Sequence, residues 1–434
     1  MSQTTAPRIV SASAEFADSH TLTRYLATGG YEALKKALTM HPEQVAAEVD
    51  AASLLGRGGA GFPAGRKWSM LRRSPLSYLV VNGDESEPAT FKDHFLIERD
   101  PHQLVEGTII AAYALQVNQA FIYLRGEFAL GLERVQQAVN DAYEHGALGS
   151  KIFDSDFSLD LVVHPGAGAY ICGEETSLLE ALEGKRGFPR IKPPFFPAVT
   201  GLYGEPTVVN NVETMSNLPW IVLNGGAAFA ALGGGRSAGT RLFALAGKVN
   251  RPGVYEVEMV TNTFRDLIYD PAFGGGMVGD RPVKAIIPGG VSAPWFGAHQ
   301  LDTPLGQDEV AGQGSMLGSG SVVVLNDTDC VVRAAWRITK FFSRESCGQC
   351  TPCREGSGWI ERIMYRLEHG GGRPEDLELV LDLCDNISPG LSWPPQQTTI
   401  CVLGPSIPSA VNSALTMFRS DFEAHIAHGG CPHG

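Results

Sequence analysis

The chain has 434 residues, of which 44% are hydrophobic and 19% charged, a composition that suits a globular protein of several domains. Its formal net charge of −13 argues against a general nucleic-acid-binding protein, because neutralising phosphates requires a basic surface. We expect neither a secretory signal nor a membrane span, because no basic start precedes an apolar run and no apolar stretch is long enough. The eight cysteines therefore favour metal ligands or free thiols in a reducing compartment over disulfides.

The first part of the chain alternates between strands and helices after a polar, weakly helical N-terminal extension at residues 1–50. Strands are predicted at 78–82, 120–124 and 159–164, and helices at 101–115 and from about 130. Such alternation predicts an α/β domain, over residues 51–238, with a parallel sheet covered by helices.

The second part changes character twice. Residues 239–327 contain short strands separated by Pro-Gly and Gly-Gly turns, with one helix around 263–269, which predicts a small α+β domain. Residues 328–434 contain helical stretches at 329–343, 354–369, 375–387 and 405–426, divided by glycines at 370–372 and prolines between 389 and 395. A small helical bundle is the natural interpretation of this last part.

The strongest chemical signal is a C-x2-C-x2-C segment formed by Cys347, Cys350 and Cys353. This spacing folds a tight loop whose three thiolates reach three irons of a [4Fe–4S] cubane, and Cys401, at the start of a later helix, is placed to bind the fourth. A zinc site is the main alternative. Zinc sites usually add a second C-x2-C or a histidine pair, and neither follows here.

The remaining cysteines receive plainer interpretations. Cys384 continues the apolar spacing of its helix and is predicted to be a packed thiol. Cys330 and Cys431 have no partners at ligand spacing along the sequence. Cys172 lies inside a glycine-rich segment described below.

A glycine-rich loop at 56–65 begins the α/β domain and is framed by cations. Its glycines let backbone N–H groups face an anion, and Arg57, Arg66 and Lys67 add positive charge, so a phosphate or diphosphate fits. Phe62 could stack on an aromatic ring. The loop matches neither standard nucleotide fingerprint, and a flexible surface loop is the alternative. The candidate residues here are Gly56, Arg57, Gly58, Gly59, Ala60, Gly61, Phe62, Gly65 and Lys67.

An acidic segment follows the strand at 78–82, where ligands of open α/β folds bind. Asn82 and Asp84 could bind a polar ring edge or ribose, and Glu85 and Glu87 could accept from ribose hydroxyls or an amino group. A solvated acidic turn is the alternative, but crowded carboxylates repel one another unless they serve a binding function.

Two further segments have the same polar, loop-like character. Residues 166–176 follow a strand and open a helix, and they include Gly166, Tyr170, Gly173, Glu174 and Glu175. The second segment combines Lys192 and Phe195 with Asn210, Asn211 and Thr214. Paired asparagines offer both donors and acceptors to the edge of a heterocycle.

These segments occur together, in this order, in one protein family. Over about residues 20–425 the chain resembles the NADH-oxidising flavoprotein subunit of respiratory complex I (NADH:quinone oxidoreductase), of the F or 51-kDa type, through the motifs GRGGAGFPAGRKW, NGDESEP, GAGAYICGEET, KPPF, VVNNVET and ESCGQCTPCREG. The resemblance implies a Rossmann-like domain for FMN and NADH, a ubiquitin-like β-grasp domain, and a four-helix bundle carrying one [4Fe–4S] cluster.

The resemblance also implies roles for the candidate residues. The glycine loop, Glu87 and Phe195 would help to hold NADH, with Phe196 as the alternative stacking residue. FMN would be held by the segment 166–176 together with Asn82, Asp84, Asn210, Asn211 and Thr214. Glu85 and Glu87 would shape the nicotinamide pocket.

The implied activity is hydride transfer from NADH to FMN, followed by one-electron transfer to the cluster. As a complex I component the chain would contact the [2Fe–2S] 24-kDa-type subunit and the large Fe–S subunit, in a peripheral arm on the cytoplasmic side of the inner (plasma) membrane. It would meet the membrane only indirectly. One alternative is the diaphorase subunit of an NAD-linked hydrogenase or formate dehydrogenase. Such subunits often add an N-terminal thioredoxin-like domain or C-terminal ferredoxin cysteines, and we expect neither here. Another is a non-catalytic electron-transfer protein that has lost its flavin.

Overall fold

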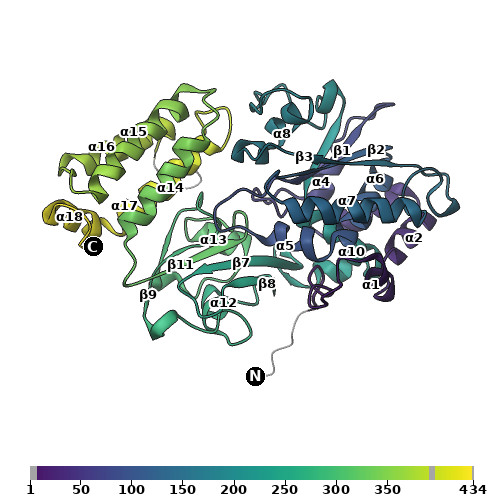
Figure 1. The fold of residues 1–434 in the computed structure, drawn as a ribbon, viewed down its shortest axis with the longest axis horizontal. Coiled ribbons are helices and arrows are strands. Elements are labelled where there is room, and N and C mark those ends of the chain that lie inside the picture. Colours follow the sequence, from purple (N-terminus) through teal and green to yellow (C-terminus); the bar gives the residue numbers. More distant parts are fainter. Residues whose placement is uncertain (1–6, 391–395, 433–434) are drawn as a thin grey trace.

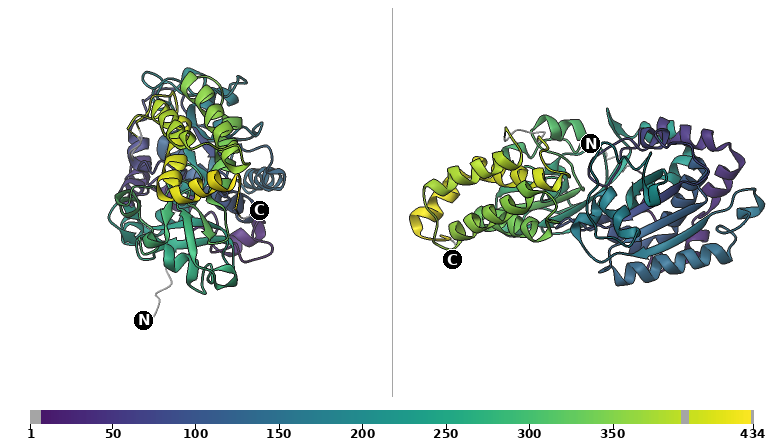
Figure 2. Two further views of the ribbon diagram at one scale, coloured as in Figure 1. Left: turned by 90° about the vertical axis from the view of Figure 1, so that its left-hand side faces the viewer. Right: turned by 90° about the horizontal axis from the view of Figure 1, so that it is seen from above.

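The computed structural model describes residues 7–390 and 396–432, so part of the predicted proline-rich separator, residues 391–395, lies outside the described residues. Three parts are visible in Figure 1: an α/β domain, a small mixed sheet below it, and a helical bundle beside both. Figure 2 shows that the α/β domain and the bundle occupy opposite ends of an elongated molecule. Among the described residues, no helix is long and apolar enough to cross a membrane.

The α/β domain is built on a parallel sheet with the strand order β3-β2-β1-β4. The strands are β1 (Tyr78–Gly83), β2 (Gln119–Leu124), β3 (Asp160–Pro165) and β4 (Thr207–Asn211). The first three were predicted, whereas β4 was treated only as a binding motif. Because β1 pairs with β2 on one side and β4 on the other, the chain reverses its winding direction beside β1. This is the position at which open α/β sheets bind ligands.

Helices cover both faces of this sheet. They are α4 (Ala64–Ser69), α5 (Lys92–Arg99), α6 (Pro101–Leu115), α7 (Ala129–Glu144), α8 (Glu175–Leu182), α9 (Val212–Ser216), α10 (Leu218–Asn224) and α11 (Gly226–Ala230). The central helix, α6, begins at the cap residue Asp100, whose side chain accepts from the Gln103 N–H, and ends at Gln116 in the left-handed region. Proline at its first position suits a helix start, because that N–H would have no intrahelical partner.

Residues 7–51, the described part of this N-terminal region, contain three helices, α1 (Leu22–Ala27), α2 (Glu32–Thr39) and α3 (Pro42–Ala51). They pack against α6 in the hydrophobic core of the α/β domain. Glu106, a carboxylate within the apolar α6, accepts hydrogen bonds from the backbone N–H groups of Tyr31, at 3.0 Å, and Leu34, at 2.8 Å. This buried carboxylate therefore fastens the N-terminal helices to the domain.

The middle domain is a five-stranded mixed sheet with the order β10-β9-β11-β7-β8. Its elements are β7 (Thr240–Gly247), β8 (Gly253–Glu258), α12 (Phe264–Tyr269), β9 (Val283–Ile287), β10 (Phe296–Gly297), α13 (Gln307–Gly312) and β11 (Ser321–Asn326). The central pair β11–β7 is parallel and the other pairs are antiparallel. This is the predicted ubiquitin-like β-grasp arrangement, preceded by a small hairpin of β5 (Gly233–Gly234) and β6 (Ser237–Ala238).

In the described residues of the C-terminal part, a four-helix bundle is followed by one shorter helix. Its helices are α14 (Val331–Glu345), α15 (Thr351–Glu368), α16 (Glu375–Ile387), α17 (Leu403–Met417) and α18 (Arg419–His428). The helices α14 and α16 each pack against both α15 and α17, which closes the bundle. The predicted stretch 405–426 was wrong as a single helix, because the backbone of Phe418 leaves the helical conformation between α17 and α18.

Candidate functional site

The end of β1 meets the glycine-rich segment 166–176 directly. The side-chain N–H of Asn82 donates to the carbonyl of Gly173 at 2.8 Å, and its Oδ1 accepts from the backbone N–H of Asp84 at 3.1 Å. Gly173 ends a short 3-10 turn, Tyr170–Gly173, that leads into α8. Two of the predicted segments, far apart in the sequence, therefore form one surface at the carboxyl ends of the strands.

Asp84 carries a buried carboxylate with unused hydrogen-bonding capacity. Its Oδ2 accepts from the Ser86 hydroxyl at 3.2 Å, while its Oδ1 has no hydrogen-bond partner among the described residues. Burial raises the pKa of this carboxyl group to about 7. A buried acceptor without a donor is costly, so this oxygen suits a hydroxyl or N–H group of a bound ligand.

The glycine loop is fastened beside the end of β4. The backbone N–H of Arg57 donates to the hydroxyl of Thr214 at 2.9 Å. A Cβ atom on Gly58 would lie only 3.1 Å from the Cβ of Asn211, and one on Gly65 would lie 2.6 Å from the Cα of Asp50. A side chain at position 65 would therefore displace the backbone, whereas one at position 58 would make a tight contact with Asn211.

The guanidinium of Arg57 does not face the open side of this loop. It is buried and donates to the carbonyls of Ala238, at 2.9 Å, and Thr240, at 2.8 Å. Burial lowers its pKa to about 10. The prediction was that the charge of Arg57 contributes to a phosphate site. In the structure its side chain instead anchors the glycine loop to the start of the following domain.

Two lysines are paired with two glutamates next to the loop. Lys67 Nζ lies 2.9 Å from Glu175 Oε2 and donates to the carbonyl of Val209 at 2.9 Å, while Lys192 Nζ lies 2.8 Å from Glu174 Oε1. Burial alone would raise the pKa of Glu175, but Lys67 and Lys192 outweigh it and hold that pKa below its ordinary value. The four predicted residues therefore form one charge-balanced cluster.

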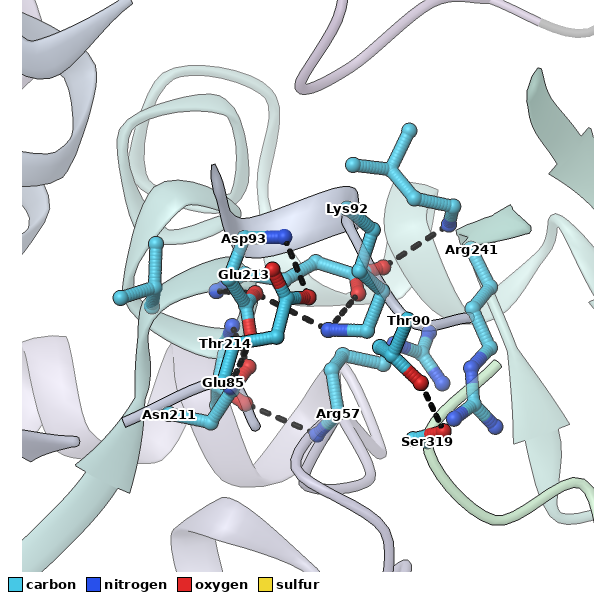
Figure 3. A network of polar contacts seen from close by, with 12 residues as sticks. Arg57, Glu85, Thr90, Lys92, Asp93, Asn211, Glu213, Thr214, Arg241 and Ser319 are labelled. Atoms are coloured by element: carbon cyan, nitrogen blue, oxygen red, sulfur yellow. Dashed lines mark hydrogen bonds and ion pairs between the residues drawn. The ribbon is translucent and has the colours of Figure 1, made fainter. Parts of the chain in front are cut away.

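A buried polar network supports the site from below (Figure 3). Lys92 Nζ lies 2.9 Å from Asp93 Oδ1 and 2.8 Å from Glu213 Oε2, and Asn211 donates to Asp93 Oδ2 at 2.6 Å. Sequence reasoning missed Lys92 and Asp93, because they lie in no recognised motif. Glu213 lies within the VVNNVET motif but was given no role, so an acidic residue beside the asparagine pair was the available signal.

Glu85 belongs to this network. Its two carboxylate oxygens accept from the backbone N–H groups of Asp93, at 2.8 Å, and His94, at 2.9 Å, at the start of α5. Burial, followed by the charge of Asp93, raises the pKa of Glu85 to about 8. Both of its oxygens are thus engaged by the protein itself.

Glu87 lies where three parts of the chain meet. Its Oε1 accepts from the N–H and the hydroxyl of Ser292, at 2.8 and 2.7 Å, and its Oε2 accepts from the hydroxyl of Tyr170 at 2.6 Å. Burial raises the pKa of this carboxyl group. Ser292 belongs to the β-grasp domain and was not predicted.

The predicted stacking residues remain at the surface. Phe62, Phe195 and Phe196 are 39%, 43% and 47% exposed. The guanidinium of Arg66 lies 5.9 Å from the ring centroid of Phe62. Exposed aromatic rings of this kind can stack on a planar ligand, and the choice between Phe195 and Phe196 stays open.

The predicted cluster cysteines come from two separated segments. Cys347 and Cys350 lie in the loop between α14 and α15, Cys353 lies in the first turn of α15, and Cys401 precedes α17. Burial raises the pKa of Cys353 to about 11 and that of Cys401 to about 12, and the charges of neighbouring cluster cysteines add to both shifts. Thiols so placed ionise readily only when iron binds them, so this donor set fits a [4Fe–4S] cluster.

Tyr170 connects the glycine-rich segment 166–176 with the helix that leads into the cysteine loop. Its backbone N–H donates to Glu345 Oε2 at 3.1 Å, and its ring packs edge-on against Phe341 with centroids 5.0 Å apart. Glu345 ends α14, immediately before the cysteine loop. The surface at the end of β1 and the cluster loop are therefore in direct contact.

Comparisons with known proteins agree with this geometry. A family model described as the Nuo51 FMN-binding domain matches residues 49–220, and one described as the NADH-ubiquinone oxidoreductase-F iron-sulfur binding region matches residues 333–425. These matches confirm the predicted FMN and [4Fe–4S] cofactors.

Relatives cover nearly the whole chain. The F 2 subunit of NADH-quinone oxidoreductase from Rhizobium meliloti (strain 1021) is 47% identical over 418 residues, 96% of each chain. The HndC subunit of NADP-reducing hydrogenase from Solidesulfovibrio fructosivorans is 40% identical over 98% of this chain and 84% of its own length. A chain of NAD+-reducing [NiFe]-hydrogenase, in a crystal structure of the H2-reduced state, superposes with a TM-score of 0.82 at 33% identity, covering 93% of this chain and 66% of its own. With such matches over both the flavin and the iron–sulfur regions, the chain belongs to the family of F-type subunits of NADH-quinone oxidoreductase.

Proposed function

We propose that this chain oxidises NADH by hydride transfer to bound FMN and passes the electrons singly to the [4Fe–4S] cluster of Cys347, Cys350, Cys353 and Cys401. It does so as the electron-input subunit of NADH:quinone oxidoreductase. The observation that carries the proposal is the position of Tyr170, whose hydroxyl contacts Glu87 and whose N–H contacts Glu345 beside the cluster loop. Through Tyr170, a continuous series of contacts links Glu87, which we propose lies near the nucleotide, with Glu345, which lies next to the cluster loop.

FMN, when bound, supplies the conversion between two-electron and one-electron chemistry. The protein's part is to hold and orient it. The unpartnered Oδ1 of Asp84, and the adjacent Asn82 and Gly173, support a flavin site at the end of β1. Thr214 and Asn211 position the glycine loop beside it.

NADH binds against the exposed side of the glycine loop, where Phe62 and either Phe195 or Phe196 offer ring surface. Glu87 accepts hydrogen bonds at the junction between the α/β and β-grasp domains, so it can contact a nucleotide that bridges them. Glu85 supports the site indirectly, because its carboxylate accepts hydrogen bonds from the backbone at the start of α5. The pairs Lys67–Glu175 and Lys192–Glu174 hold the loop and α8 together.

The chain works as a component of a multi-subunit enzyme, as the subunit names of its relatives indicate. Its partners are the [2Fe–2S] 24-kDa-type subunit and the large Fe–S subunit, on the cytoplasmic side of the inner (plasma) membrane. Its functional units are the FMN and NADH domain (51–238), the β-grasp domain (239–327) and the cluster domain (328–434), preceded by residues 1–50.

The alternative is the diaphorase subunit of an NAD-linked hydrogenase or formate dehydrogenase, and the likeness to two hydrogenase chains favours keeping it. The same flavin and cluster chemistry serves both. Co-purified subunits distinguish them, because a quinone reductase brings membrane subunits, whereas a hydrogenase or formate dehydrogenase brings a hydrogen- or formate-oxidising subunit.

The test is purification of the chain with its neighbouring subunits, followed by counts of FMN and iron and an assay of NADH–ferricyanide reduction. We expect one FMN for each copy of this chain and at least four irons, because the partner Fe–S subunits add their own, with NADH bleaching the flavin absorbance. Absence of FMN from an intact, iron-containing preparation would favour the electron-transfer protein without flavin. Flavin that NADH does not reduce would exclude the proposed reaction.

A further inference from the structure

Four potential metal ligands meet at the end of the helical bundle, outside the flavin and cluster sites. Cys330 caps the start of α14, Glu368 ends α15, His425 lies on α18, and Cys431 follows that helix. Their ligand atoms all lie within 4.8 Å of one another. Cys330 and Cys431 have no partners at ligand spacing along the sequence, but folding brings together residues about a hundred positions apart.

The orientation of His425 is suited to metal binding. Its Nδ1 lies 2.7 Å from the carbonyl oxygen of Asp421. A carbonyl can only accept, so Nδ1 carries the hydrogen and the neutral ring presents a bare lone pair at Nε2. That Nε2 lies 3.2 Å from Cys330 Sγ and 3.4 Å from Glu368 Oε2. A hydrogen bond from the second ring nitrogen to a carbonyl is the usual way in which proteins orient a metal-binding histidine.

Glu368 is oriented in a similar way. Arg333 Nε donates to Glu368 Oε1 at 2.6 Å, which leaves Oε2 directed toward the sulfur and the ring. Cys330 Sγ lies 3.5 Å from this Oε2 and accepts from the backbone N–H of Arg333 at 3.2 Å. The N–H of Cys431 donates to the carbonyl of Glu368 at 3.2 Å, so the backbone itself holds the last ligand in place.

The spacing agrees with one tetrahedral ion. Metal–ligand bonds of about 2.0–2.3 Å at tetrahedral angles place neighbouring ligand atoms about 3.3–3.8 Å apart. The three contacts of 3.2, 3.4 and 3.5 Å lie close to this range. His425 and Glu368 are buried, whereas Cys330 and Cys431 are partly exposed.

We propose that Cys330, Glu368, His425 and Cys431 bind one structural Zn²⁺ ion, separate from the iron–sulfur cluster. Sulfur and imidazole donors exclude a calcium or magnesium site and suit zinc. Four protein ligands make a closed, structural centre. Cys330 and the cluster loop lie at opposite ends of α14, whose 15 residues span about 22 Å, so the ion is no part of the cubane.

The ion would fasten α18 and the segment after it to the ends of α14 and α15 (Figure 1). Access is available from both sides of Arg333. One surface hollow is lined by Glu368 and Cys431, and a second by Cys330 and Arg333.

The test measures zinc and iron together by plasma mass spectrometry on the purified complex containing the full chain. Changing His425→Gln should remove one zinc per complex and leave iron and FMN unchanged. The matched control is His428→Gln, an exposed histidine on the same helix, which should keep the zinc. Because His425 is buried, Cys431→Ser at a partly exposed position gives a second variant, with the same expected loss.

X-ray absorption at the zinc edge gives an independent result. We expect mixed coordination, with Zn–S near about 2.3 Å and Zn–N near about 2.0 Å, and a loss of sulfur scattering in Cys431→Ser. The proposal fails if both variants retain all the zinc of the parent. It also fails if the purified parent complex, after incubation with ZnSO4, carries no more zinc than the variants. A disulfide between Cys330 and Cys431 in the parent complex would rule it out as well.

Discussion

The hydroxyl of Tyr170 donates to the carboxylate of Glu87 over 2.6 Å, while the backbone N–H of the same tyrosine donates to Glu345. One residue thus bonds to the acidic segment after β1 and to the helix that leads into the cluster loop. The donor hydroxyl favours the ionised form of Glu87, against the effect of burial on its pKa. The contact between Tyr170 and Glu87 therefore joins two segments of the chain and also opposes the rise that burial causes in the pKa of Glu87.

Replacing Glu87 with glutamine should weaken NADH binding. The substitution keeps the size and the acceptor oxygen but removes the charge, and a hydrogen bond to a charged group contributes about 1.5–3 kcal/mol. We expect the KM for NADH to rise about ten-fold or more, with FMN and iron contents unchanged. The control is Glu133→Gln on the exposed side of α7. An unchanged KM in the Glu87 variant would contradict the proposed role.

Replacing Glu85 with alanine should act mainly on stability. The variant leaves the backbone N–H groups of Asp93 and His94 without their acceptor at the start of α5. An unsatisfied buried donor costs about 1–3 kcal/mol, so urea unfolding should shift to lower concentration. An unchanged unfolding midpoint together with a raised KM would mean instead that Glu85 acts on the nucleotide directly.

The segments that meet at the end of β1 could be located from the sequence because they are compact motifs at the ends of strands. Asn82 and Gly173 are an example, since a strand end and a glycine-rich turn were both recognisable before their hydrogen bond was known. The strand β4 was missed because its five residues overlap the asparagine motif, and polar residues at a strand end obscure strand periodicity.

Other features could not be predicted from spacing at all. Lys92 pairs with Glu213 across more than a hundred residues, and Cys330 meets His425 across 95. Such pairs depend on how the sheet and the bundle close, which no local pattern encodes. The orientation of the Arg57 side chain could not be predicted for a related reason, since a cation in a glycine loop gives no sign that its side chain turns inward.

The stability of the flavin-free chain should depend on Asp84. Burial raises the folded-state pKa of this carboxyl group from 3.8 to about 7. The folded state therefore binds the proton more tightly than the unfolded state, so the associated stability is complete below about pH 4 and is lost as the pH rises toward 7. Asp84→Asn should remove this loss and raise the melting temperature of flavin-free protein more at pH 8 than at pH 5.

The same substitution should reduce FMN retention, because the asparagine amide presents donors as well as an acceptor to the ligand. The measurement is thermal unfolding at both pH values, with and without added FMN. If the melting temperatures of the flavin-free parent and the Asp84→Asn variant depended on pH in the same way, Asp84 would not ionise as proposed.

The assignment of Cys401 as the fourth cluster ligand can be tested against a second buried thiol. Cys384 is fully buried in α16, and burial raises its pKa to about 12 without the cluster cysteines contributing. Cys401→Ala should lower the iron content and alter the electron paramagnetic resonance signal of the NADH-reduced cluster, while FMN remains bound. Cys384→Ala should keep the iron content of the parent and an unchanged signal, and should lose only about 1 kcal/mol of stability through its small cavity. Loss of iron from the Cys384 variant, with full iron in the Cys401 variant, would reverse the assignment.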